Sequence, residues 1–257
     1  MTQIHPTAVI AAGAELEETV DIGPYCVIGP HVKIGGGTCL KPHVVVDGRT
    51  SIGSECTIYP FASIGSQTQD LKYSGGETFV EIGDGTTLRE SVTVNSGTHE
   101  GEVTRIGSDC HIMAYAHVAH ACQIGNHVIM ANCATLAGDV IVEDYAVLGG
   151  MAGVHQFVRI GKLCVLGGCT KVTQDCLPYM IIDGNPARVR GPNKIGLQRN
   201  SIGADAQRML KQAYRMFCRD SLSTRGAVEK IRNELDGCVE IEHFLSFVER
   251  SERGIIK

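Results

Sequence analysis

The sequence predicts a mainly β protein in which a parallel solenoid is followed by a small α-helical domain. Three observations predict it. An aliphatic residue recurs at every sixth position, in 26 of the 29 steps between positions 4 and 172. Aromatic residues make up only 5% of the 257 residues and tryptophan is absent, although 43% of the chain is hydrophobic. Beyond about Gly203, helical spacing replaces the six-residue period.

The six-residue period begins with Ile4, Ile10 and Leu16 and keeps one phase along the solenoid. It matches neither the period of an α-helix, roughly 3.6, nor that of a flat strand, roughly 2. It indicates short strands joined by regular turns and wound into stacked coils. Each coil lays its aliphatic residues on those of the coil below, which builds a core without aromatic residues. The period does not determine the handedness of the winding.

Two interruptions of the period predict loops that leave the solenoid, at residues 65–81 and 95–105. Asp70 and Gly76 break the aliphatic column first, and Glu100 breaks it again. Loops that leave a rigid scaffold often carry binding residues. A tolerated insertion is the alternative at both places.

A second column, four residues after each aliphatic position, holds small side chains and accounts for most of the cysteines. A buried cysteine behaves as a small hydrophobic residue, and thiols stay reduced in the cytosol. We therefore expect structural roles, and neither disulfides nor metal ligands, for the six of the eleven cysteines that fall in this column: Cys26, Cys56, Cys110, Cys122, Cys164 and Cys176.

The C-terminal part is expected to be helical, which divides the chain into domains at 1–190 and 191–257. The segment 179–190, with Gly184 and Pro186, is interpreted as a loop. Apolar residues then recur at three- and four-residue steps from 206 to 217, as in an amphipathic helix. Two more helices are expected at 223–235 and 239–250, with Ser223 as the N-cap of the first and Gly237 at a helix end.

Composition excludes some classes of function. A net charge of −5 disfavours a nucleic-acid-binding protein. No run approaches 18 apolar residues, so no integral membrane segment is expected. The first residues, Met-Thr-Gln-Ile-His-Pro, lack the features of a signal peptide. We therefore expect a cytoplasmic protein.

Histidine is concentrated in one part of the solenoid, where His111, His117, His120, His127 and His155 lie. A neutral imidazole can take a proton from a hydroxyl group near pH 7. Ordinary surface histidines at turns are one alternative. Zinc binding through the His-x-x-His spacing of residues 117–120, as in a hydratase, is another.

The string His117-Val-Ala-His120, followed by Gly149-Gly-Met-Ala-Gly-Val-His-Gln-Phe157, resembles the UDP-N-acetylglucosamine O-acyltransferase family of hexapeptide-repeat acyltransferases. The resemblance extends to Gln69-Asp-Leu-Lys-Tyr73 and to the end of the chain. It implies a left-handed parallel β-helix in a homotrimer, with active sites between neighbouring subunits.

The resemblance also implies the reaction, which is the first step of lipid A biosynthesis. An (R)-3-hydroxyacyl group moves from acyl carrier protein to the glucosamine 3-hydroxyl of UDP-GlcNAc. His120 matches the general base of the family, and Gly138 matches the residue whose backbone N–H stabilises the oxyanion. No metal or dissociable cofactor is implied, because 4′-phosphopantetheine arrives on the carrier protein.

Other positions match the substrate-contacting residues of the family, and Gly168 matches the floor of its acyl groove. The matching substrate-contacting positions are Asp70, Lys72, His117, Asp139, His155, Gln156, Asn193 and Arg199. Basic residues of the helical domain, from Lys211 to Arg232, are expected to face the acidic carrier protein. An ordinary solvated helix face is the alternative.

Three residues depart from the family pattern. Ala121 stands where many relatives carry Asp directly after the base, and Asn95 and Asp139 stand where many carry His. These departures leave open a related acceptor, such as a 3-amino sugar nucleotide, and another hexapeptide acyltransferase as the alternative function.

Overall fold

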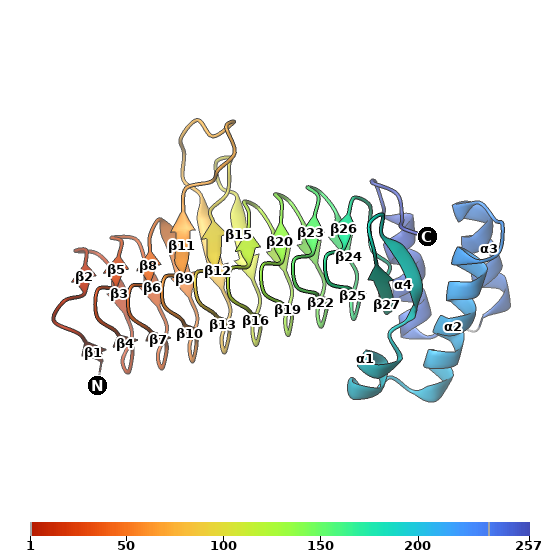
Figure 1. The fold of residues 1–257 in the computed structure, drawn as a ribbon, viewed down its shortest axis with the longest axis horizontal. Helices are drawn as coiled ribbons and strands as arrows, with labels where there is room; N and C mark the ends of the chain where they lie inside the picture. Colours follow the sequence, from red (N-terminus) through yellow and green to blue (C-terminus); the bar gives the residue numbers. More distant parts are fainter. Residues whose placement is uncertain (1, 236) are drawn as a thin grey trace.

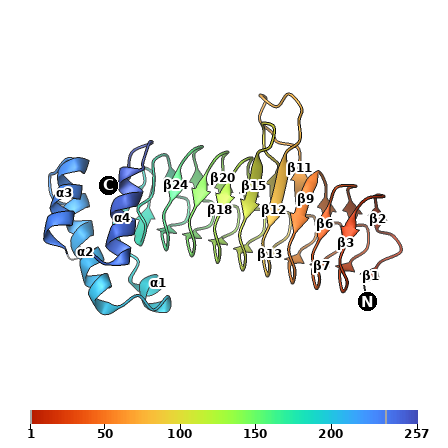
Figure 2. The ribbon, with the colours of Figure 1, turned by 180° about the vertical axis from the view of Figure 1, so that it is seen from behind.

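The computed structural model describes residues 2–235 and 237–257 as a three-sided prism of parallel strands with helices stacked on one end (Figure 1). The N-terminus lies at the opposite end of the prism from the helices, and one long loop projects from its side (Figures 1 and 2). The winding is left-handed, which confirms the predicted fold class. Met1 and Asp236, which fall in the two predicted domains, lie outside the described residues.

In the described part of the chain the strands form three sheets, called sheets A, B and C. Sheet A contains β1 (Gln3–Ile4), β4 (Asp21–Ile22), β7 (Cys39–Leu40), β10 (Thr57–Ile58), β13 (Thr87–Leu88), β16 (His111–Ile112), β19 (Ile129–Met130), β22 (Val147–Leu148), β25 (Val165–Leu166), β27 (Met180–Asp183) and β28 (Arg188–Pro192). Sheet B contains β2 (Val9–Ile10), β5 (Val27–Ile28), β8 (Val45–Val46), β11 (Ser63–Ser66), β14 (Thr93–Asn95), β17 (His117–Val118), β20 (Thr135–Leu136), β23 (Gly153–Val154) and β26 (Lys171–Val172). Sheet C contains β3 (Glu15–Leu16), β6 (Lys33–Ile34), β9 (Arg49–Ile52), β12 (Phe79–Ile82), β15 (Val103–Ile106), β18 (Gln123–Ile124), β21 (Ile141–Val142) and β24 (Arg159–Ile160).

The six-residue period sets the register of these sheets. Three repeats make one coil, so Ile22 pairs with Ile4 below it and with Leu40 above it. The aliphatic column is buried from Ile22 onward, whereas Ile4 in the first coil is 48% exposed because no coil covers it. The six cysteines of the small-residue column are buried, as expected for small core residues, and are free thiols. Ladders of small and aliphatic side chains therefore form the core of the prism.

The turns between the sheets form three edges of the prism, called AB, BC and CA after the sheets they connect. Most turns contain one residue in the left-handed region, for example Ala121 at φ 56° and Asp139 at φ 59° on edge BC. Side chains at such corners lie directly above one another in successive coils. On edge AB, for instance, Tyr25 stacks on His43 with ring centroids 5.0 Å apart.

Both interrupting loops leave from edge BC. The first occupies residues 67–78 between β11 and β12, and the second occupies 96–102 between β14 and β15. Each lies inside the span expected from the broken period. The first loop is the long projection seen beside β11 and β12 (Figure 1).

The segment 179–190, interpreted as a loop from the sequence, forms an antiparallel hairpin of β27 and β28, so that interpretation is wrong outside its turn. Met180 and Ile182 are buried where β27 pairs with β25 and covers the open end of sheet A. A pairing with the end of a sheet leaves no six-residue signal in the sequence. The predicted domain boundary at 190/191 falls within β28 and stays a prediction.

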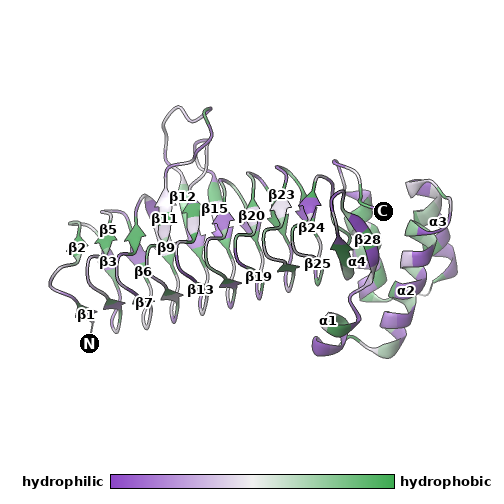
Figure 3. Ribbon diagram, in the orientation of Figure 1, coloured by the Kyte–Doolittle hydropathy of each residue, from purple (hydrophilic) through white to green (hydrophobic). Residues whose placement is uncertain are grey.

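Helices follow in the order α1 (Lys194–Arg199), α2 (Ala204–Cys218), α3 (Thr224–Glu234) and α4 (Val239–Glu249). The last three confirm the predicted helices, and the Ser223 hydroxyl caps α3 by accepting from the Gly226 N–H. Hydrophilic and hydrophobic residues both appear on α2 and α3 (Figure 3). The Phe217 and Phe244 rings meet edge to face at 5.8 Å and join α2 to α4. α1 was not predicted.

The chain ends by returning to the prism. Ile255 forms a parallel bridge with Asp175, and the Ser251 hydroxyl donates to the buried Asp175 carboxylate at 2.7 Å. These contacts attach the helices to the last coil. Among the described helices, none has the length and apolar character needed to span a bilayer.

Candidate active site

Edge BC brings most of the predicted site residues together. His120 lies in the turn after β17, Gly138 and Asp139 lie in the turn after β20, and the pair His155–Gln156 lies in the turn after β23. The loop carrying Asp70 leaves the same edge lower on the prism. Residues separated by up to 86 positions therefore converge because each coil returns the chain to the same edge.

The His120 ring packs directly against the backbone of the next coil. A Cβ atom at Gly138 would lie 2.2 Å from both Cε1 and Nε2 of the ring, so only glycine leaves room for the imidazole in this position. The Asp139 N–H donates to the His120 carbonyl at 3.0 Å, and the Ala121 N–H donates to the Thr104 hydroxyl at 2.8 Å. These bonds hold the turn that contains His120 and Ala121 in register with the coil above it and the coil below it.

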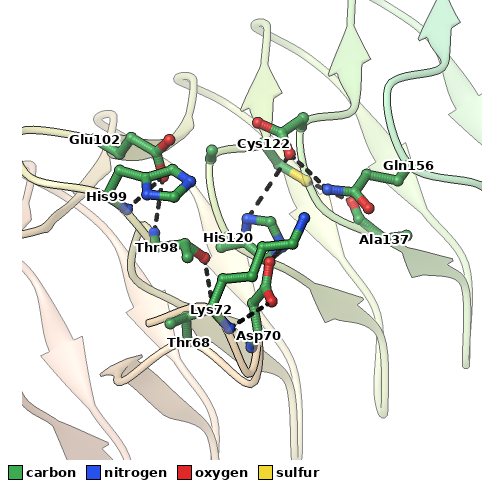
Figure 4. A network of polar contacts seen from close by, with 12 residues as sticks. Thr68, Asp70, Lys72, Thr98, His99, Glu102, His120, Cys122, Ala137 and Gln156 are labelled. Atoms are coloured by element: carbon green, nitrogen blue, oxygen red, sulfur yellow. Dashed lines mark hydrogen bonds and ion pairs between the residues drawn. The ribbon is translucent and has the colours of Figure 1, made fainter. Parts of the chain in front are cut away.

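Two carboxylates face the two ring nitrogens of His120. Asp70 Oδ2 lies 3.7 Å from Nε2, and Asp139 Oδ2 lies 3.8 Å from Nδ1. The His120 side chain is only 12% exposed. Gln156 Nε2 donates to the same Asp139 oxygen at 2.8 Å. Figure 4 shows Asp70 and Lys72 on one side of His120 and Gln156 on the other. An imidazole held between two carboxylates is suited to general acid–base catalysis.

His117 lies on β17, the strand that leads directly into the turn of His120. Its Nδ1 shares a hydrogen bond of 2.7 Å with the Thr93 hydroxyl, and burial lowers the pKa of His117. A lowered pKa keeps this ring neutral near pH 7, so it is suited to hydrogen bonding with a substrate. His155 is positioned by its own turn, since its Nδ1 lies 3.1 Å from the Gln156 carbonyl.

Asn95 holds the loop that carries Asp70 and Lys72. Its buried amide donates to the Gln67 carbonyl at 2.9 Å and to the Ser66 carbonyl at 3.3 Å, and its oxygen accepts from Gln69 Nε2 at 3.4 Å. Within the loop, Asp70 Oδ1 accepts from the Lys72 N–H at 3.0 Å. Asn95 therefore anchors the base of the loop.

Further bonds tie the two loops to each other. The hydroxyls of Thr68 and Thr98 are 3.0 Å apart, and the Thr78 hydroxyl donates to the Ser96 hydroxyl at 3.0 Å. Glu102 accepts from two backbone N–H groups of the second loop, one of them that of His99 at 3.0 Å. The shorter loop thus supports the longer one.

Three predicted residues do not join the others in one chain. Asn193 is the N-cap of α1, where its Oδ1 accepts from the Gly196 N–H at 3.0 Å and its Nδ2 donates to the Leu163 carbonyl on edge CA at 2.9 Å. Arg199 ends the same helix. Gly168 lies on edge AB, in the turn before β26. Their contact with substrate stays a prediction.

Two of the five clustered histidines lie elsewhere. His127 is on edge CA, where it stacks on Tyr145 at 4.6 Å and its Nδ1 lies 3.8 Å from Asp109 Oδ2. His111 begins β16 in sheet A. Only part of the histidine cluster seen in the sequence is therefore a cluster in space.

Thr93, Thr104 and Glu102 are structural supports of the site that were not identified from the sequence. Thr104 is fully buried in the small-residue column, but this column also holds Thr38, Thr50, Thr86 and Thr170, so a threonine there does not mark the site. Thr93 and Glu102 carry no signal either, since their partners come from other coils or across a loop.

No group of three or more His, Cys, Asp or Glu side chains in the described residues is arranged to hold a metal ion. The cysteine nearest to His120 in sequence is not suited to act as a nucleophile. Burial raises the pKa of the Cys122 thiol to about 12, and its sulfur donates to the Ala137 carbonyl at 3.1 Å (Figure 4).

Comparison with known proteins identifies the family. Residues 104–138 match the bacterial transferase hexapeptide repeat, and residues 175–256 match the second domain of UDP N-acetylglucosamine O-acyltransferase. The acyl-[acyl-carrier-protein]–UDP-N-acetylglucosamine O-acyltransferase of Syntrophobacter fumaroxidans is 47% identical over 99% of this chain and 100% of its own length. The enzyme with this name from Anaeromyxobacter dehalogenans is 44% identical over 99% of both chains. The chain belongs to this family.

Solved structures of UDP-N-acetylglucosamine acyltransferases have the same architecture over the whole chain. The structure from Bacteroides fragilis superposes with a TM-score of 0.97 at 36% identity, covering 99% of this chain and 100% of the other. The structure from Francisella novicida gives 0.94 at 34% identity, covering 99% and 94%. The acyltransferase family therefore accounts for the prism and for the helical end together.

Proposed function

We propose that this protein transfers an (R)-3-hydroxyacyl group from acyl carrier protein to the glucosamine 3-hydroxyl of UDP-N-acetylglucosamine, with His120 as the general base, in the first step of lipid A biosynthesis. The observation that carries the proposal is the geometry of His120. It is a nearly buried imidazole between two carboxylates, on the edge from which the loop of Asp70 projects. Full-length relatives with this name support the choice of substrates.

In the proposed reaction, His120 Nε2 accepts the proton of the sugar hydroxyl as its oxygen attacks the thioester carbonyl. The attack forms a tetrahedral intermediate whose oxygen carries negative charge. When the intermediate collapses, the carbon–sulfur bond breaks and the imidazolium returns the proton to the departing thiolate of phosphopantetheine. Proton and electron pairs balance, and the reaction needs no other cofactor.

Gly138 is positioned to stabilise the oxyanion through its N–H. The equivalent position of the repeat, directly before a left-handed corner residue, holds proline in other coils: Pro24, Pro42 and Pro60. Proline has no N–H, so the hydrogen-bond ladder does not use the amide of this position. The Gly138 N–H is therefore free to bind a developing negative charge, and such donors are effective in a buried site.

We further propose that the complete site forms between subunits of a homotrimer. Asp70, Lys72, Asp139 and the pair 155–156 come from edge BC, and His117 comes from the adjoining strand β17. Gly168, Asn193 and Arg199 are on or near other edges of the same chain. A neighbouring subunit would bring those edges to the site, with Arg199 as a cation for the diphosphate and Gly168 in the acyl groove.

Acyl carrier protein is the proposed donor partner, and it carries the phosphopantetheine. Part of the positive charge expected to attract it is already neutralised, because Arg225 pairs with Glu229, Lys230 with Asp220, and Arg232 with Glu249. Lys211 and Arg215 of α2 are thus the better candidates for contact. The eleven free cysteines support a reducing compartment and the cytoplasm.

The test is direct. The purified protein is incubated with UDP-GlcNAc and a panel of 3-hydroxyacyl carrier proteins, and the sugar nucleotide is analysed by mass spectrometry. We expect the mass of one hydroxyacyl group to be added, and His120→Ala to lower the rate about 100- to 10,000-fold. A wild-type protein that acylates no sugar nucleotide would contradict the proposal.

A 3-amino analogue of the sugar nucleotide is run in parallel as the second candidate acceptor. It is favoured by one observation, the Asp70 carboxylate 3.7 Å from His120 Nε2 on the side left open to the acceptor, since an acceptor amine arrives as a cation. Faster acylation of the analogue than of UDP-GlcNAc would assign the amino sugar as the acceptor.

A further inference from the structure

The Nδ1 atom of His120 is buried and makes no hydrogen bond to any described residue. A histidine that uses Nε2 as a base must carry its proton on Nδ1, and the orientation of the ring then depends on what accepts that proton. An unpartnered buried ring nitrogen costs free energy, so the site needs an acceptor close to Nδ1.

Asp139 is the residue that meets this need. Its Oδ2 is 3.8 Å from Nδ1, and its main chain is bonded to that of His120, because the Asp139 N–H donates to the His120 carbonyl at 3.0 Å. The left-handed backbone of Asp139 and the 2.8 Å bond from Gln156 Nε2 hold its carboxylate near Nδ1. The acceptor thus comes from the rigid coil above the base.

Asp70 is placed for a different task. It belongs to the projecting loop, and its Oδ2 faces Nε2, the nitrogen that must remain open to the sugar hydroxyl. Its other oxygen accepts from the Lys72 N–H within the loop. An Asp70 carboxylate on this side can contact the acceptor sugar, but it cannot hold the proton of Nδ1 on the opposite side of the ring.

We propose that Asp139 is a positioning residue for His120: its carboxylate accepts the hydrogen bond from Nδ1–H, selects the tautomer with a free Nε2 and stabilises the imidazolium formed during acyl transfer. This inference rests on the proposed function and assigns to Asp139 a role beyond contact with substrate. A movement of about 1 Å closes the 3.8 Å separation to hydrogen-bond distance, and catalytic hydrogen bonds often tighten when substrate binds.

Asp139→Ala is the variant that tests the assignment. Asp139 has φ 59°, where most side chains are strained, but Ala121 has φ 56° at the same corner of the preceding coil. Alanine is therefore accommodated at this corner by the chain itself. Asp139→Asn is the conservative variant, because it keeps a neutral acceptor and removes the charge.

Asp109→Ala is the matched control. Asp109 also lies at a left-handed corner, at φ 54°, and its Oδ2 is also 3.8 Å from the Nδ1 atom of a histidine, His127. This pair is on edge CA, away from the base of the same chain. A general effect of removing a corner carboxylate would appear equally in both variants.

We expect Asp139→Ala to lower kcat about 10- to 100-fold with KM within about threefold, Asp139→Asn to fall between it and the wild type, and Asp109→Ala to stay within about twofold. In protein labelled with ¹⁵N-histidine, the Nδ1–H tautomer of His120, assigned by its loss in His120→Gln, should decrease in Asp139→Ala. A structural role would not produce that change at an unaltered melting temperature.

Two results would overturn the inference. One is a wild-type kcat in Asp139→Ala, and the other is an unchanged His120 tautomer together with a raised KM, which would make Asp139 a substrate contact only. Failure of the proposed function is distinguishable from both, because the wild-type protein itself would then transfer no acyl group, whereas the tautomer measurement would still report the His120–Asp139 pair.

Discussion

Replacing Gly138 by alanine should slow acyl transfer strongly without unfolding the protein. The added methyl group would lie 2.2 Å from Cε1 and Nε2 of His120, against a normal contact of about 3.4 Å, so the ring must move by about 1.2 Å. The imidazole is at the end of the His120 side chain and can move, whereas the backbone of the coil that carries residue 138 cannot. A displacement of about 1 Å at a reacting group can cost about 100-fold in rate, which is the loss we expect in kcat.

Gly150→Ala is the control for this experiment. Gly150 also precedes a left-handed corner residue, Met151, but a methyl group there would meet only the Asn132 carbonyl oxygen at 3.4 Å. Acyl transfer is measured by mass spectrometry and unfolding by circular dichroism for both variants. We expect both to melt within a few degrees of the wild type. Wild-type turnover by Gly138→Ala would refute the argument that contact with this glycine positions the His120 ring.

Three further predictions concern the loop and the helical end. Asn95→Ala removes the anchor of the loop at 67–78 and should destabilise the anchored conformation of this loop by about 1 to 3 kcal/mol. The effect should appear as faster hydrogen exchange in the loop and a lower kcat/KM; unchanged exchange would count against the anchor. Ser223→Ala should lower the free energy of unfolding by about 1 kcal/mol in urea titrations, since α3 loses its cap, and no change would show that the cap bond is not formed in solution. Although burial alone would raise the pKa of Glu143, the hydrogen bond and charge of His243 hold it below its ordinary value. Its contribution to stability should therefore be complete above about pH 5 and lost as the pH falls below about 4, so the difference between the wild type and Glu143→Gln should shrink in acid; a constant difference would contradict this sign.

The positions of the two loops show how far local pattern extends into the site. A broken six-residue column marked both loops within a few residues. Each coil must keep its stack of aliphatic side chains, and an inserted loop interrupts that stack. The same column did not reveal β27 and β28, whose hairpin covers the end of sheet A, or the cap formed by Asn193. Those elements are determined by contacts with residues that are distant in the chain, and such contacts produce no periodic pattern in the sequence.

By itself, the sequence determined the solenoid, the register of its core, the helices α2 to α4 and, through its resemblance to a family, the residues from which the site is built. These features follow from a repeat that every coil must satisfy separately. Only the tertiary structure decided which of those residues meet: that His120 lies between Asp70 and Asp139, that His127 lies on another edge, and that Asn95 anchors a loop. The reason is geometric, since residues from separate coils become neighbours only when the winding returns the chain to one edge of the prism.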